Sequence, residues 1–124
     1  MDDIALLASA ARTATSASSD QINYGNARGV IVTLDCTVDP ASASITMDIE
    51  HKDTVSGKYE SLMLTAAAVT AVGTHTYIVV PGVGAAADDV VEVAGFPIGK
   101  VWRVNVTHAD TDSITYSVGA SYVA

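Results

Sequence analysis

The residue types that most often carry metal chemistry are scattered in this sequence. The three histidines, His51, His75 and His108, lie far apart, and no two have the i, i+2 spacing that places two side chains on one face of a strand. A zinc site needs three or four such ligands brought together in space. Isolated histidines of this kind are more typical of surface or half-buried strand positions, so we predict no metal site.

The acidic residues form two short clusters that could offer oxygen ligands to a cation. One is Asp110-Thr111-Asp112, and the other is Asp88-Asp89 with Glu92. A calcium loop supplies more ligands, together with a glycine at its sharp turn. We therefore predict that the first cluster makes side-chain hydrogen bonds in a turn, and that the second belongs to a solvated loop.

Candidate nucleophiles and phosphate loops lack the neighbours that their chemistry requires. Cys36 falls on the apolar side of an alternating stretch, where a free cysteine behaves as a small buried hydrophobe. No Gly-x-Ser-x-Gly elbow is present, and Gly82-Val83-Gly84 lacks the third glycine and the lysine of a phosphate loop. Hence we predict no catalytic nucleophile and no bound cofactor.

Asp48 and Glu50 are the most suggestive pair of carboxylates. They could act as general acid and base only if other carboxylates opposed them in a cleft. Because they alternate with apolar residues over 45–50, we predict that they lie on the solvent face of a strand. The chain is therefore expected not to be an enzyme, although distant residues could still converge in space.

The composition of the 124 residues restricts the partners. Six Lys and Arg stand against fourteen Asp and Glu, a net charge of −8, which argues against nucleic acid and against anionic lipid. Hydrophobic residues make up 49%, enough for a core, whereas charged residues make up only 16%, which suggests that part of the surface is covered by a partner.

The single cysteine excludes an intrachain disulfide. The Met-Asp-Asp start lacks the basic region of a secretory signal, so we expect synthesis in the cytoplasm.

Apolar residues recur with period two along most of the chain, as in half-buried strands. This pattern predicts strands at 30–38, 45–50, 59–65, 74–80, 102–107 and 113–122. We therefore predict an all-β fold, an antiparallel, jelly-roll-like β-sandwich or a flattened barrel of about seven to eight short strands.

Two segments lack a clear strand pattern. Residues 3–11 read as a short helix or an apolar arm, and 82–99 as a helical turn or an ordered excursion along a partner. The predicted organisation is an N-terminal arm at 1–12 and a single sandwich domain at 13–124.

Five segments in this order resemble a group of small virion structural proteins of tailed bacteriophages, of the head decoration (cement) type. They are Arg28–Asp35, Gly57–Tyr59, Tyr77–Val83, Trp102–Asp110 and Ser113–Ala120, the last two forming the predicted C-terminal hairpin. The stretch 82–99 departs most from the group's pattern.

The resemblance implies a non-enzymatic protein that binds the exterior of a phage capsid and stabilises it. It implies the major capsid protein as partner, self-association, often as a trimer, and a place on the capsid surface of a virion made in the bacterial cytoplasm. Apolar residues in the arm and in the stretch 82–99 are then the candidates for partner contact. They are Ile4, Leu6, Leu7, Val83, Val90, Val91 and Phe96.

Two other functions remain open on the sequence. A tail or head–tail connector component would form ring-like oligomers. A carbohydrate-binding β module would present exposed aromatic rings, with Trp102, Tyr59, Tyr77, Tyr116 and Tyr122 as the candidates. The position of Trp102 in an alternating strand favours the core instead.

Overall fold

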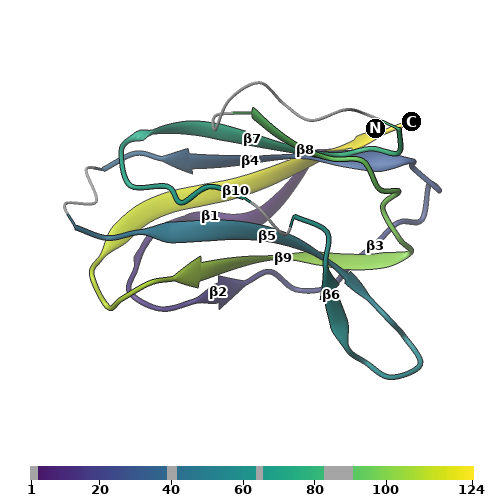
Figure 1. Cartoon of the computed structure of the whole chain (residues 1–124), viewed down its shortest axis with the longest axis horizontal. Coiled ribbons are helices and arrows are strands. Elements are labelled where there is room, and N and C mark those ends of the chain that lie inside the picture. The colour runs from purple at the N-terminus through teal and green to yellow at the C-terminus, as the bar shows by residue number, and fades with distance from the viewer. Residues whose placement is uncertain (1–2, 39–41, 64–65, 83–90) are drawn as a thin grey trace.

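Two five-stranded sheets face each other across one apolar core (Figure 1). The computed structural model describes residues 3–38, 42–63, 66–82 and 91–124, and these ranges contain no helix. The predicted all-β sandwich is confirmed. The alternative of a barrel is wrong, because each sheet ends in strands that pair on one side only.

The first sheet, called sheet A, has the strand order β1-β10-β4-β7-β8. Its strands are β1 (Asp3–Arg12), β10 (Ile114–Val123), β4 (Gly29–Cys36), β7 (Gly73–Val79) and β8 (Val91–Ala94). The β7–β8 pair is parallel and the other pairs of the sheet are antiparallel.

The second sheet, called sheet B, has the order β2-β9-β5-β6, and β3 also pairs with β9. Its strands are β2 (Ser16–Ala17), β3 (Gln21–Ile22), β9 (Val101–His108), β5 (Ile45–Lys52) and β6 (Tyr59–Ser61). Between β2 and β3, the buried Ser18 continues the pairing, because its amide donates to the carbonyl of Val104 and its hydroxyl accepts from the Val104 amide, both at 3.0 Å.

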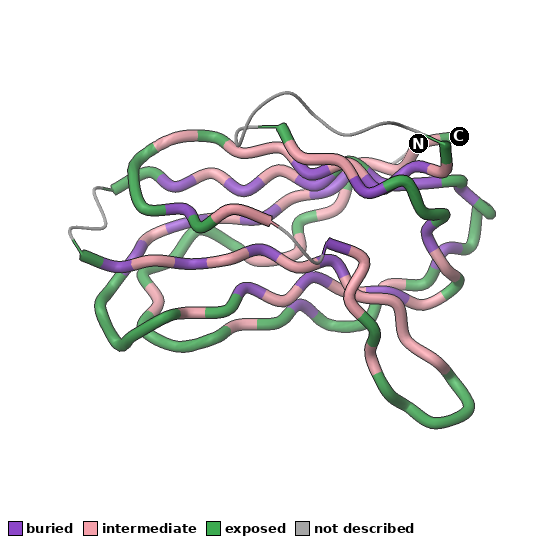
Figure 2. The backbone as a smooth tube through the Cα atoms, in the orientation of Figure 1, coloured by how far each residue is buried: buried purple, intermediate pink, exposed green. Residues whose placement is uncertain are grey.

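The core is built by the period-two alternation of the long strands, which places every second residue between the sheets (Figure 2). The largest fully buried side chains are Trp102, Tyr77 and Tyr116. Cys36 is buried as well. The predictions that Trp102 and Cys36 belong to the core are therefore confirmed.

Two polar bridges join the sheets, one near each end of the β9–β10 hairpin. The indole nitrogen of Trp102 donates to the Tyr122 hydroxyl at 3.1 Å, with the rings edge to face. At the other end, Nε2 of His108 lies 2.8 Å from the Tyr116 hydroxyl. Because each bridge satisfies buried polar groups across the core, it fixes the spacing of the sheets.

The expectation of a short helix at 3–11 is wrong, because these residues form strand β1 along β10. Two register shifts interrupt the pairing, between Ala5 and Leu7 and between Leu7 and Ala10. The Arg12 guanidinium donates to main-chain carbonyls on both strands, including that of Tyr116 at 2.8 Å, and so holds the irregular end of β1 in place. Bulges of this kind also protect an edge strand from pairing with another chain.

Other boundaries also differ from the sequence prediction, and the strand predicted at 30–38 ends at Cys36. The strand predicted at 59–65 ends at Ser61, and residues 64–65 lie outside the described residues. In the stretch predicted as a turn of helix or an excursion, residues 91–94 form β8, which extends sheet A beyond β7. Residues 83–90 lie outside the described residues.

Candidate interaction surface

The outward side of sheet A, called here the outer face, is a broad surface of small and aliphatic side chains. The strand register aligns them in two rows that cross all five strands. The first row is Asp3, Ser121, Ile31, Ile78 and Val93, and the second is Ala5, Gly119, Thr33, Thr76 and Val91. In the first row, three aliphatic side chains lie next to one another on β4, β7 and β8.

Charge is nearly absent from the outer face. Among the described residues on this face, only Asp3 and Asp35 are ionisable. Asp3 stands at one end of the first row, and Asp35 lies two residues beyond the second row on β4. Each carboxylate accepts a hydroxyl hydrogen bond, from Ser121 at 2.9 Å and from Thr74 at 3.1 Å. Because the whole chain has a net charge of −8, this face differs from the average surface in carrying so few charged side chains.

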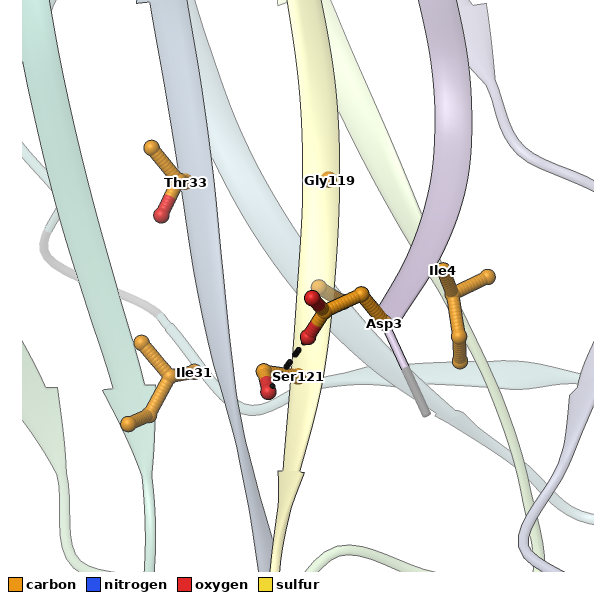
Figure 3. A pocket seen from close by; sticks show the side chains of 7 residues that line it. Asp3, Ile4, Ile31, Thr33, Gly119 and Ser121 are labelled. Carbon is orange, nitrogen blue, oxygen red and sulfur yellow. Dashed lines mark hydrogen bonds between the residues drawn. The ribbon is translucent and has the colours of Figure 1, made fainter. Parts of the chain in front are cut away.

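A shallow hollow of about 240 Å³ lies in the outer face, over β10 and between β1 and β4 (Figure 3). Gly119 forms its floor, Ile4 and Ile31 lie on opposite sides, and Asp3 and Ser121 lie at one rim. A Cβ atom on Gly119 would meet only the Ile4 carbonyl oxygen, at an ordinary contact distance of 3.5 Å. The glycine is therefore not required by the fold, and its missing side chain leaves the hollow open.

The outward side of sheet B is different, because it carries a network of ionic contacts. Nε of Arg103 lies 2.7 Å from Oε1 of Glu50, and Nζ of Lys52 lies 2.8 Å from Oδ2 of Asp20. The Tyr59 hydroxyl also donates to Asp20. Hydrogen bonds from Lys52 and Tyr59 lower the pKa of Asp20 below its ordinary value.

Four of the five aromatic rings considered for a sugar platform are buried or already in contact with a cation. Trp102, Tyr77 and Tyr116 are fully buried. The Arg103 guanidinium lies 3.5 Å above the centre of the Tyr59 ring, a cation–π contact that occupies one face of the ring. The sequence-based idea that Trp102, Tyr77 or Tyr116 stacks on a sugar at the surface is therefore wrong.

The prediction that Asp48 and Glu50 lie on the outward side of their strand, away from the core, is confirmed, and both side chains are half-buried there. Asp48 accepts from the Ser61 hydroxyl of the neighbouring strand β6 at 2.6 Å and from the Met63 amide at 3.3 Å. Burial raises the pKa of Asp48 above its ordinary value, with these hydrogen bonds opposing the rise. Glu50 is held by Arg103, so both carboxylates serve local structure.

The turn that joins β9 and β10 behaves as predicted. The Asp112 amide donates to Oδ1 of Asp110 at 2.9 Å, and the Ser42 hydroxyl donates to Oδ2 of Asp112 at 2.6 Å. Among the described parts of the chain, no group of three or more His, Cys, Asp and Glu side chains is arranged to hold a metal ion.

The structure separates the predicted partner-contact residues into three sets. Ile4, Leu6 and Leu7 are partly buried and pack against the chain's own core. Val91 and Phe96 are exposed, but Val91 belongs to the outer face and Phe96 to the loop after β8. Val83 and Val90 lie outside the described residues.

Sequence reasoning missed the centre of the outer face. Ile31, Ile78 and Val93 are apolar residues on the outward side of their strands, where a polar residue is expected. This break in the alternation was the available signal. These three residues are adjacent because β4, β7 and β8 are neighbours in the sheet, and the order of the strands cannot be read from the sequence.

Comparison of the sequence with known protein families and with curated proteins found no match. Within the described residues, no helix is long and apolar enough to cross a membrane.

Proposed function

We propose that this protein is a non-enzymatic structural component of a bacteriophage virion, and that it binds the capsid exterior through its outer face and stabilises the shell. The observation that carries the proposal is the run of adjacent aliphatic side chains Ile31, Ile78 and Val93 on β4, β7 and β8, on a face where Asp3 and Asp35 are the only ionisable residues among those described. The resemblance of the sequence to phage head decoration proteins supplies the identity of the partner, the major capsid protein.

Removing a protein surface from water has a free-energy cost that depends on the charges it carries. Burying an unpaired charge is expensive, so the centres of protein interfaces are depleted in charged residues. The centre of the outer face meets this condition, because it carries the uncharged side chains of Ile31, Ile78 and Val93. Thr33 and Thr76 lie in the adjacent row. The opposite sheet, with its ion pairs, is suited to remain in water.

The rigidity of the sandwich favours the same role. The bridges from Trp102 and His108 hold the two sheets at fixed spacing, so binding orders few additional groups. A capsid presents many equivalent positions, and any self-association between bound copies would add avidity to a weak single contact. The chain would then contribute to the stability of the shell without chemistry of its own.

The test is cosedimentation of the purified protein with its own capsids, using one substitution in the outer face and a matched control. Ile31 is the first of the three adjacent aliphatic side chains and is 37% exposed, whereas Val55 is 95% exposed in the β5–β6 turn. Ile31→Lys and Val55→Lys add the same charge. We expect Ile31→Lys to weaken capsid binding by about tenfold or more, since the ammonium would be desolvated, and Val55→Lys to bind like the wild type.

Thermal unfolding of both variants checks that they fold. The proposal is refuted if the wild-type protein fails to bind capsids and is absent from virions by mass spectrometry. It is also refuted if the protein binds isolated tails or connectors but not heads. Equal capsid binding by Ile31→Lys and the wild type would exclude the outer face as the contact surface.

A further inference from the structure

Three side chains from three strands meet at the end of the sandwich where β9 turns into β10. Arg12 is the last residue of β1, His108 is the last residue of β9, and Tyr116 lies on β10. The Arg12 guanidinium lies 4.8 Å from the centre of the Tyr116 ring, and Nε2 of His108 lies 2.8 Å from the Tyr116 hydroxyl. Tyr116 therefore connects the other two residues, and the three together are called the Tyr116 cluster.

The end of β1 depends on Arg12 for its attachment to β10. The guanidinium donates to the carbonyls of Ala8 and Ala10 on its own strand and to the Tyr116 carbonyl on β10. The regular pairing of the two strands is interrupted by a register shift just before Ala10, and only three paired residues follow the shift. Residues 8–11 are exposed, so little burial supplements the guanidinium there.

The main chain of His108 is held more firmly than the end of β1. His108 pairs with Ile45 on β5, and its amide donates to the Thr15 hydroxyl at 3.1 Å. Strand β9 lies inside sheet B between β2 and β5, whereas β1 lies at the edge of sheet A. A change of charge at His108 is therefore expected to displace the edge strand β1 and to leave β9 in place.

Protonation of His108 changes its hydrogen bond with Tyr116. A neutral imidazole has one N–H and one acceptor nitrogen, whereas the imidazolium has two N–H groups and only donates. After protonation, Nε2 must donate to the Tyr116 hydroxyl, whose own proton then needs another acceptor. The tautomers that the neutral ring could use are thus reduced to one arrangement.

Protonation also adds a positive charge close to a permanent one. The charged and titratable groups that face His108 are Arg12 from β1, Tyr116 from β10 and Asp110 from the β9–β10 turn. Asp110 is the opposing negative charge, and its Oδ1 already accepts from the Asp112 amide. Burial lowers the pKa of His108, the Arg12 guanidinium lowers it further, and Asp110 opposes both. The folded cluster therefore disfavours the imidazolium.

We propose that protonation of His108 releases residues 8–12, the end of β1, from β10 while the rest of the sandwich stays folded. The release separates the two positive charges. It costs little, because the carbonyls of Ala8 and Ala10 belong to exposed residues and can bind water in place of Arg12. The proposal stands on the Tyr116 cluster alone, so it is independent of the proposed capsid contact.

The test is NMR relaxation of the full chain between about pH 7.5 and about pH 5, with the order parameter of each backbone amide as the readout. We expect the amides of residues 8–12 to fall from about 0.85, the value of a rigid backbone, to below about 0.6 at the lower pH. The amides of β9 and β10 should stay rigid. The change should follow the titration of the His108 ring signals, with a midpoint below pH 6.5.

Three variants separate the charge of His108 from other effects of acid. His108→Gln retains a polar side chain that cannot be protonated, so residues 8–12 should stay rigid at both pH values. The matched control is His51→Gln, which should behave like the wild type, because His51 pairs with Trp102 at the opposite end of β9. Arg12→Gln removes the attachment itself, so residues 8–12 should be mobile at both pH values. Thermal unfolding verifies that each variant is folded.

Several results would overturn the proposal. Residues 8–12 of the wild type would remain rigid when His108 is protonated, or would already be mobile at the higher pH. They would loosen equally in His108→Gln, or the change would disappear in His51→Gln. Loss of order in every strand at the lower pH would also overturn it, since acid would then unfold the whole domain instead of releasing one end.

Discussion

Tyr77 lies near the middle of β7, fully buried between the sheets, and its hydroxyl has no hydrogen-bond partner among the described residues. Burial raises the pKa of Tyr77 far above its ordinary value, and the Glu92 carboxylate adds to the rise, so the hydroxyl stays protonated. Tyr116 provides a matched comparison, because it is also fully buried but its hydroxyl lies 2.8 Å from Nε2 of His108.

The same chemical change at these two tyrosines should have opposite effects on stability. A buried hydroxyl without a partner costs about 1–3 kcal/mol, whereas a satisfied hydrogen bond contributes about 0.5–1.5 kcal/mol. Tyr77→Phe removes the cost, at the expense of the small contact made by one oxygen. We therefore expect Tyr77→Phe to raise the free energy of unfolding by about 1 kcal/mol, and Tyr116→Phe to lower it by a similar amount.

Urea denaturation of the wild type and both variants measures this difference directly. The midpoints should move in opposite directions with equal slopes, because the surface exposed on unfolding does not change. In thermal unfolding, a change of about 1 kcal/mol corresponds to a shift of about 4 °C for a domain of this size. A loss of about 1 kcal/mol or more in Tyr77→Phe would refute the reasoning, since it would require that the hydroxyl is hydrogen-bonded in solution, for example to a buried water.

Three further predictions follow from the packing and the titration of single residues. A Cβ atom on Gly29 would clash with the carbonyl oxygen of Val79, so Gly29→Ala should destabilise the fold by about 2 kcal/mol in urea denaturation. Gly119→Ala should change stability by less than about 1 kcal/mol, and equal losses in the two variants would contradict the steric argument. Trp102→Ala should lower the free energy of unfolding by about 3–5 kcal/mol, and a loss below about 1 kcal/mol would show that the ring is not in the core. Burial and the nearby Arg12 guanidinium lower the pKa of His108 below its ordinary value of 6.5. The unfolded chain therefore binds more protons than the folded chain just below pH 6.5, so His108 lowers stability as pH falls through this value. His108→Gln should flatten the dependence of stability on pH in this range, and an unchanged slope would contradict the assignment to His108.

The strands that the sequence predicts well are those in which each residue alternates between water and the core. Strands β4, β5, β9 and β10 have this pattern, and it also places Cys36 and Trp102 inside. Strand β1 was not recognised, because its many alanines favour a helix locally and its partner β10 is distant in the sequence. Strand β8 was missed for a related reason, since a parallel edge strand is defined by its neighbour and not by a local turn.

The candidate interaction surface was less predictable than the fold. Apolar residues outside the recognised strands, such as Ile4 and Leu7, were natural candidates for partner contact, yet they pack against the chain's own core. The outer face depends on the register that aligns Ile31 with Ile78 and Ile78 with Val93. Register across three strands is a property of the assembled sheet, and only the apolar residues on the outward side of each strand indicated it beforehand.

The position of β10 inside sheet A has a consequence for how the chain acquires its structure. Strand β10 is the last strand described, yet it lies between β1 and β4 and pairs with both (Figure 1). During synthesis, β1 and β4 therefore leave the ribosome before the strand that joins them exists. Closing contacts between residues as distant as Asp3 and Ser121 is slow, because the entropy of a long loop must be lost first. Until β10 docks, β1 has no partner strand and the edge of β4 opposite β7 stays unpaired, so prompt completion of this sheet protects the nascent chain from aggregation.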